Sequence, residues 1–170
     1  MPMRFEDEFA VLYHEHFPRL ARYLGRLGGD ADLAADLAQE AFVRLYRRGQ
    51  APDTPGAWLV TVATNLLRNA RSTRSRRARL LTPARGADTQ SDPPPSPAAA
   101  TEAEGERRRV RATLDQLPER DQQLLLLRAE GYSYHELARI LGLNEASVGT
   151  LLARARTAFR ERWEGTRNAP

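Results

Sequence analysis

Two hydroxyl groups and one guanidinium group fall on the same side of a predicted helix near the end of the chain. With Ser147 placed at zero and roughly 100° per residue, Thr150 falls at about 300° and Arg154 at about 340°. The opposite side holds the apolar residues Val148, Leu152, Ala155 and Phe159. Small donors and acceptors with an Arg are the groups that read base edges and phosphates in a major groove. The pattern favours a DNA-recognition helix, and an ordinary amphipathic hairpin is the alternative.

The residues before this helix carry the start and stop signals of a helix-turn-helix. Ser133 and Glu136 have the capping-box spacing, in which each side chain accepts a hydrogen bond from the backbone N–H of the other. Gly142 suits the left-handed backbone that ends such a helix, and Asn144 is a good N-cap for the next one. We therefore expect a helix-turn-helix over 131–163.

A predicted helix over 57–81 ends in a run of positive charge. Half of the residues in 68–79 are cations, with no acid among them: Arg68, Arg71, Arg74, Arg76, Arg77 and Arg79. Cations at the carboxyl end of a helix complement its dipole, but six exceed what that role needs, and phosphate contact is the better explanation. The predicted polar side of the helix is formed by Thr61, Asn65, Arg68, Asn69 and Ser72. Its predicted buried side is formed by Trp58, Leu59, Val62, Ala63, Leu66 and Ala70.

Two further helices are predicted in the first half of the chain. Apolar residues at helical spacing predict one helix over 5–27, which Pro18 should bend or divide. Asp30 is positioned to cap a second helix that reaches Arg48. The predicted core stripe of this second helix is Leu33, Leu37, Ala41 and Leu45. Its other faces mix acidic, amide and apolar groups, a mixture that is ordinarily just solvated.

The composition of the whole chain excludes several classes of protein. All 26 basic residues are Arg, set against 22 acidic residues, and the formal charge of +4 favours a polyanionic partner only weakly. The chain has no Cys, so it offers no disulfide, thiolate metal site or thiol redox sensor. Its three His do not form a metal-ligand set, and we expect no cofactor and no catalytic site. Because no apolar stretch is long enough to span a membrane, we expect a soluble, cytoplasmic protein.

Residues 82–105 have the composition of a linker between two small helical domains. The stretch PPPSPAAA favours extended backbone and cannot form a packed core. One Arg faces five acidic residues in 82–106, whereas 13 Arg and 9 acids occupy 1–81, and 12 Arg and 8 acids occupy 107–170. An acidic tether thus joins two basic halves. We predict an all-α chain with domains at 1–81 and 106–170, the second ending in the helix-turn-helix.

In this order, the motifs resemble those of the extracytoplasmic-function, or group IV, sigma factors of the sigma-70 superfamily. The family's promoter -35-binding domain is similar to LPERDQQLLLLRAEGYSYHELARILGL with SVGTLLARAR. Its helix that grips the clamp of the largest polymerase subunit is similar to AADLAQEAFVRLYRR, and its -10-binding segment to WLVTVATNLLRNARSTRSRR. The resemblance covers nearly the whole chain and implies a transcription initiation factor without catalytic activity.

The resemblance assigns roles to residues of the first half. The residues expected to dock on core polymerase are Asp36, Gln39, Glu40 and Phe42. Asn65 matches the residue with which family members bind a flipped -10 base, and the loop 49–55 would form the wall of its pocket. The other expected -10 contacts, chiefly to backbone phosphates, are Arg68, Asn69, Arg71 and Arg74. Asn69 replaces an Asp that is frequent in the family.

In the second half, the resemblance assigns -35 contacts to Ser147, Thr150 and Arg154. Gly149 stands where Lys or Arg is usual, and Ala153 where an aromatic residue or His is common. Gly149 costs about 1 kcal/mol of helix stability relative to Ala and removes a DNA contact. The -35 sequence that this chain reads therefore cannot be copied from the family.

The resemblance also implies a set of partners. These are core RNA polymerase, with the acidic linker in its RNA channel; promoter DNA, duplex at -35 and single-stranded at -10; and a cognate anti-sigma factor. A stand-alone helix-turn-helix regulator is an alternative that needs no docking helix. An RNA-binding adaptor fits the Arg run but not the helix-turn-helix. The promoter consensus, the regulon and the stimulus do not follow from the sequence.

Overall fold

Three helices form the first half of the fold. They are α1 (Phe5–Gly28), α2 (Ala31–Arg48) and α3 (Pro55–Leu81). The computed structural model describes residues 4–81 and 102–167 of the chain. Within α1, Pro18 does not divide the helix, which continues through it as a single element.

Four helices form the second half. They are α4 (Glu102–Asp115), α5 (Glu119–Ala129), α6 (Tyr134–Leu141) and α7 (Glu145–Arg167). Every regular element in the described ranges is a helix, which confirms the all-α prediction. Because α4 begins at Glu102, it takes in the last four residues of the predicted linker 82–105. The rest of that linker lies outside the described residues.

The predicted helix caps form as expected. The carboxylate of Asp30 accepts from Leu33 N at 3.0 Å and starts α2. Ser133 and Glu136 make both hydrogen bonds of a capping box at the start of α6. Gly142 ends α6 at φ 64°, in the left-handed region that favours glycine, and the Asn144 side chain accepts from Ala146 N at 3.0 Å. Local sequence therefore determines where these helices begin and end.

The buried faces of α2 and α3 differ from the predicted ones. In α2, Leu33 and Leu37 are only half-buried. Its buried residues are Ala34, Ala38, Ala41, Phe42 and Leu45. In α3, four of the six residues predicted to be buried are only half-buried: Trp58, Val62, Leu66 and Ala70. Its buried apolar residues are Ala57, Leu59, Val60, Ala63 and Leu67. In α3, packing against α6 as well as α1 and α2 displaces the buried face by about one residue from the predicted stripe.

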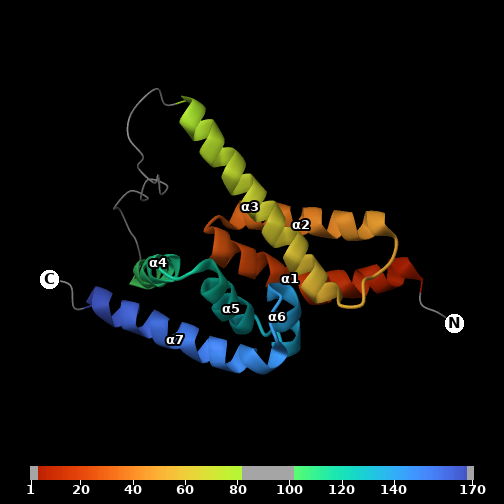
Figure 1. The fold of residues 1–170 in the computed structure, drawn as a ribbon. Coiled ribbons are helices and arrows are strands. Elements are labelled where there is room, and N and C mark those ends of the chain that lie inside the picture. The colour runs from red at the N-terminus through yellow and green to blue at the C-terminus, as the bar shows by residue number, and fades with distance from the viewer. Residues whose placement is uncertain (1–3, 82–101, 168–170) are drawn as a thin grey trace.

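The two halves pack directly on each other. α1 contacts α5, and α3 contacts α6, while α7 lies across α4, α5 and α6 (Figure 1). Fully buried side chains from both halves, such as Tyr23 and Leu24 of α1 and Leu124 and Leu127 of α5, belong to one continuous apolar cluster. The carboxyl end of α3 extends beyond this body (Figure 1). The functional side chains thus lie on helices held by a shared core.

Candidate nucleic-acid interface

The predicted recognition face lies on α7 and points to solvent. Ser147, Thr150 and Arg154 are all exposed. On the opposite side of the helix, Val148, Leu152 and Ala155 are completely buried. The predicted division of α7 into an apolar and a polar side is therefore confirmed, and the polar side offers two hydroxyls and a guanidinium for a groove of DNA.

Gly149 lies next to an aromatic ring that sequence reasoning did not single out. A Cβ built on Gly149 would meet Cε2 of Tyr134 at 3.5 Å, an ordinary van der Waals distance. Tyr134 is 41% exposed at the first position of α6, with the guanidinium of Arg128 at 5.5 Å from its ring centre. A partly exposed Tyr beside the recognition helix adds a hydroxyl and an apolar ring to the surface that Gly149 leaves sparse. In the sequence, the position of Tyr134 directly after the N-cap Ser133 indicates that Tyr134 begins this helix.

The polar side of α3 carries the predicted -10 residues. Asn65, Arg68, Asn69, Arg71 and Arg74 are all exposed. The structure places these residues in different environments. Arg71 donates from Nη2 to the Leu27 carbonyl at 2.6 Å and thereby caps the end of α1. Asn65 and Arg68 instead line a hollow between α3 and the second half of the chain.

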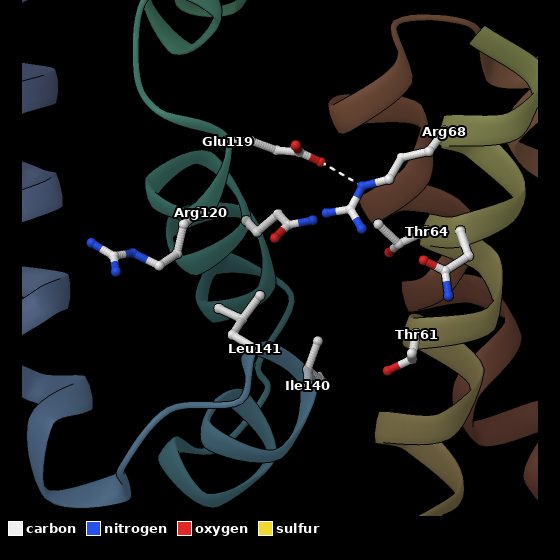
Figure 2. Close-up of a pocket in the computed structure, with 9 residues that line it drawn as sticks. Thr61, Thr64, Arg68, Glu119, Arg120, Ile140 and Leu141 are labelled. Carbon is white, nitrogen blue, oxygen red and sulfur yellow. Dashed lines mark hydrogen bonds and ion pairs between the residues drawn. The ribbon is translucent and has the colours of Figure 1, made fainter. Parts of the chain in front are cut away.

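This hollow has a volume of about 380 Å³ and two chemically different walls (Figure 2). The α3 wall is formed by Thr61, Thr64, Asn65 and Arg68. The facing wall is formed by Glu119, Arg120, Gln123, Ile140 and Leu141. Arg68 Nε donates to Glu119 Oε1 at 2.9 Å across it. A residue assigned to DNA phosphate is therefore paired with a carboxylate of the same chain.

The loop 49–55 borders a second hollow, of about 490 Å³. Residues 50–54 line it together with Trp58 and Thr61 of α3 and Arg139 of α6. Asn65 does not line this hollow. Thr61, one turn before Asn65, lines both hollows, so they adjoin, and a single pocket formed by Asn65 and the loop stays a prediction. The spacing of four residues between Thr61 and Asn65 indicates that the two side chains lie on the same side of α3.

The predicted docking surface on α2 is only partly available. Asp36 and Gln39 are exposed, and Glu40 is partly exposed and accepts from Arg44 Nε at 2.9 Å. Phe42 is 1% exposed, and its ring packs at 4.9 Å from that of Tyr13. Phe42 therefore cannot itself contact polymerase in this structure. Its ring holds α2 against α1, because burying an aromatic side chain is more favourable than leaving it exposed to water.

Burial shifts the pKa values of three groups between α1 and the second half. Burial lowers the pKa of His16, and the neighbouring Arg19 guanidinium lowers it further. Burial raises the pKa of Tyr23 to about 12, and its hydroxyl lies 3.4 Å from Thr64 Oγ1. Burial also raises the pKa of Tyr132, which lies beneath Arg19. At neutral pH all three groups are uncharged, so the charges at this contact are those of Arg and Glu.

The part of the chain that the structure describes has neither a cluster of metal ligands nor a helix that could span a membrane. No group of three or more His, Cys, Asp or Glu in residues 4–81 and 102–167 is arranged to hold a metal ion. No helix in these ranges is both long and apolar enough to cross a membrane.

Comparisons with known proteins agree with the division of the fold. Residues 12–77 match the family described as Sigma-70 region 2, and residues 107–159 match Sigma-70, region 4. The first range contains α2 and most of α3, and the second contains α5, α6 and the recognition face of α7. Each half of the chain thus corresponds to a separate functional region of one family.

Relatives match along nearly the entire length. RNA polymerase sigma factor CarQ of Myxococcus xanthus is 30% identical, over 92% of this chain and 89% of that protein. ECF RNA polymerase sigma factor SigL of Mycobacterium tuberculosis is 32% identical, over 88% and 85%. The chain therefore belongs to the ECF RNA polymerase sigma factors of the sigma-70 family. Its class is that of a transcription initiation factor that works with RNA polymerase.

Two solved structures have the same fold. CnrH, in complex with the cytosolic domain of CnrY, is 26% identical with a TM-score of 0.66, covering 94% of this chain and 90% of that one. The sigma factor RpoE of Bartonella quintana, in complex with the anti-sigma factor NepR, is 20% identical with a TM-score of 0.63, over 94% and 96%. The second likeness concerns the fold alone.

Proposed function

We propose that this sigma factor directs core polymerase to promoters by contacting duplex DNA at -35 with α7 and the separated strand at -10 with α3. The observation that carries the proposal is the exposure of Ser147, Thr150 and Arg154 on α7, whose opposite side is buried, within the region 4 match. Asn65 and Arg68 are the matching polar groups of the region 2 half. No step of this activity makes or breaks a covalent bond in the chain.

The α7 surface supplies the duplex contact. An Arg paired with small hydroxyls can bind base edges in the major groove and the adjacent phosphates. Gly149 and Ala153 leave this surface with few charges, so its contribution comes from shape and hydrogen bonds more than from counterion release. The helix therefore helps to position a polymerase and is a weak binder of DNA by itself.

The α3 surface supplies the strand contact. Asn65 has both a donor and an acceptor for the edge of an unstacked base, and Thr61 is one turn away. Arg68 and Asn69 are exposed one turn after Asn65, and Arg74 lies further along α3, so these side chains could contact the backbone of the same strand. Capturing a base outside the stack favours the melted duplex over the closed one, which is how this surface would promote melting.

The acidic face of α2 supplies the polymerase contact. Asp36, Gln39 and Glu40 project from α2, and Phe42 supports them from beneath. Asp36→Arg should abolish core-dependent transcription, because it reverses a charge at the docking surface. Glu164→Arg, an exposed charge reversal at the end of α7, is the matched control. If the chain were instead a stand-alone helix-turn-helix regulator, the Asp36→Arg variant would keep its activity.

An anti-sigma factor is the second proposed partner. Its support is that CnrH, which is 26% identical to this chain, was solved in complex with the cytosolic domain of CnrY. RpoE of Bartonella quintana, which shares the fold, was solved with an anti-sigma factor. Such a partner would cover the docking and DNA surfaces together. Affinity purification of the tagged chain should recover a protein other than polymerase subunits that blocks transcription in vitro. Recovery of core polymerase alone would argue against it.

The linker is proposed to occupy the RNA channel of polymerase. Asp88 and Asp92 lie outside the described residues, whereas Glu102 and Glu104 are in the first turn of α4. Substituting Arg for all four acids should impair early transcript formation. An unchanged ratio of abortive to full-length transcripts would contradict the idea.

The central test is run-off transcription with purified core polymerase on a randomised promoter library. The native chain should yield promoter-specific transcripts. Asn65→Ala and Arg154→Ala should remove them, and Glu164→Arg should not. Absence of any core-dependent initiation by the native chain would refute the proposed function.

A further inference from the structure

The recognition face of α7 has a neutral centre between two cations. Arg154 and Arg156 are both exposed, and they project from the helix about 160° apart. Gly149, Ala153 and Thr150 lie within the arc between them that faces away from the core, and none of the three carries a charge. A helix that enters a major groove with this face would direct its cations to phosphates on either side and its small neutral groups to the base edges.

The ring of Tyr134 bounds the space beside Gly149. A Cβ built on Gly149 would meet Cε2 of this ring at 3.5 Å. Apart from neighbouring parts of α7, no other atom of the described residues lies within 4 Å of that Cβ position. Gly149 therefore leaves an open space with an aromatic edge along one side. An apolar group that approaches from outside could contact the α7 backbone and the Tyr134 ring together.

The Tyr134 ring is held in this position without DNA. Tyr134 is 41% exposed and follows the N-cap Ser133, whose capping box fixes the start of α6. The guanidinium of Arg128 lies 5.5 Å from the ring centre, where the cation is attracted to the π-electrons. Arg128 is itself anchored, because its Nη1 donates to the Tyr132 carbonyl at 3.1 Å. The space beside Gly149 thus has a preformed wall, which lowers the cost of ordering it when a ligand binds.

The chemistry of this centre matches one base of the four. In the major groove, guanine presents two acceptors that suit Arg or Lys, adenine suits Asn or Gln, and cytosine suits a carboxylate. Thymine presents an acceptor and the C5-methyl group, which suits Ala, the methyl group of Thr, or an aromatic ring. Gly149 and Ala153 have no polar side-chain atom, and the groups next to them are Thr150 and the Tyr134 ring. The centre therefore fits thymine, whereas Arg154 at its edge fits guanine or a phosphate.

We infer that Gly149, Ala153 and the Tyr134 ring receive the C5-methyl group of a thymine in the -35 element, and that they determine specificity at this base pair. This inference rests on the proposed duplex contact of α7. Because Gly149 has no side chain, the helix backbone can approach the base edge closely. The Thr150 hydroxyl is within one turn of Gly149 and can donate to O4 of the same base. A long cationic side chain at 149 would fill the space and offer donors in place of an apolar surface.

Deoxyuridine tests the methyl group alone, because it pairs as thymine does and lacks only that group. The holoenzyme of the full chain and core polymerase first selects a -35 element from a randomised duplex library. Each thymine of the selected element, on either strand, is then replaced singly by deoxyuridine in a fluorescein-labelled promoter, and affinity is measured by polarisation. One replacement should weaken binding about fourfold, through the loss of one buried methyl group, and the others should have little effect. At the sensitive position, 5-methylcytosine should bind more tightly than cytosine.

Variants assign the methyl contact to this surface. Gly149→Arg fills the space and Ala153→Asn places an amide over it, so both should remove the difference between thymine and deoxyuridine. Ala112→Asn, the same change at an exposed position of α4, is the matched control and should keep the difference. Tyr134→Phe retains the ring and should also keep it, whereas Tyr134→Ser should reduce it. Circular dichroism establishes that each variant is folded.

The outcomes separate this inference from the proposed function. A selected -35 element in which no deoxyuridine weakens binding, or which contains no thymine, would overturn the inference and leave the proposed function standing. Deoxyuridine sensitivity that persists in both Gly149→Arg and Ala153→Asn would also overturn it, because the methyl group would then be read elsewhere on the chain. A holoenzyme that selects no -35 sequence would refute the proposed function and the inference with it.

Discussion

The two DNA-reading surfaces of this sigma factor differ in what lies over them. On α7, Ser147, Thr150 and Arg154 face solvent without another element in front of them. On α3, Asn65 and Arg68 line a hollow whose other wall is formed by α5 and α6, and Arg68 is paired with Glu119. The second half of the chain therefore presents one surface and faces the other.

The two surfaces therefore depend on the sequence in different ways. The α7 surface follows from the caps and the apolar stripe of one short motif. The state of the α3 surface depends on how two regions meet that are distant in the chain. We expect changes in α7 to act on duplex recognition alone, and changes at the contact to act on strand access.

The largest expected effect comes from removing the support of the α7 surface. Leu152 is completely buried, where α7 packs on the other helices of its half. Leu152→Ala should lower the free energy of unfolding by about 2–5 kcal/mol, from lost burial and the remaining cavity. Thr157→Ala, exposed on the same helix, should change it by less than about 0.5 kcal/mol. Urea denaturation followed by circular dichroism measures both, and equal losses in the two variants would refute the predicted packing.

The next effect concerns the reading surface itself. Arg154→Ala should weaken promoter binding by about 1–3 kcal/mol through the loss of a major-groove contact, with unfolding unchanged. Titration of the polymerase complex on labelled promoter duplex measures it. Arg160→Ala, which removes the same charge farther along α7, should have the smaller effect. If the two variants weaken binding equally, Arg154 acts only as a general charge.

A smaller effect should stabilise the same helix. Gly149→Ala restores helix propensity worth about 1 kcal/mol, since Gly is among the least favourable helix residues. The new Cβ has room, with Tyr134 Cε2 at 3.5 Å. The midpoint of urea unfolding should therefore rise. A lower midpoint would show that the Tyr134 ring cannot accommodate the methyl group.

The smallest effect tests the contact between the halves by pH. His16 Nδ1 accepts a hydrogen bond from Arg19 Nη2 at 2.8 Å, and burial lowers the pKa of His16 from the ordinary 6.5. The unfolded chain then binds the proton more readily than the folded one, so stability is present above pH 6.5 and is lost as the pH falls through 6.5 towards the folded pKa. Urea midpoints between about pH 7.5 and pH 5.5 should fall in the native chain and fall less in His16→Gln. Parallel curves for the two proteins would exclude His16 as the cause.

Much of the fold was predictable because it is encoded within single helices. Asp30, Ser133 and Gly142 act on backbone groups a few residues away, and the structure confirms each of them. The inward residues of α7 were also predictable, because one stripe packs on one core. In α3 the buried arc was wrong by about one position, since α6 adds a second packing surface that no periodicity reveals.

The sequence alone determined an all-α chain, the helix-turn-helix with its caps, and the polar residues of α3 and α7, because these depend on propensities and spacings within a few turns. The tertiary structure alone decided that Phe42 is core, that Asn65 and the loop 49–55 line different hollows, and that Glu130 is buried between two Arg. Ion pairs between residues some hundred positions apart leave no local pattern. Their partners are selected only when the packed cores of the two halves bring α1 and α3 against α5 and α6.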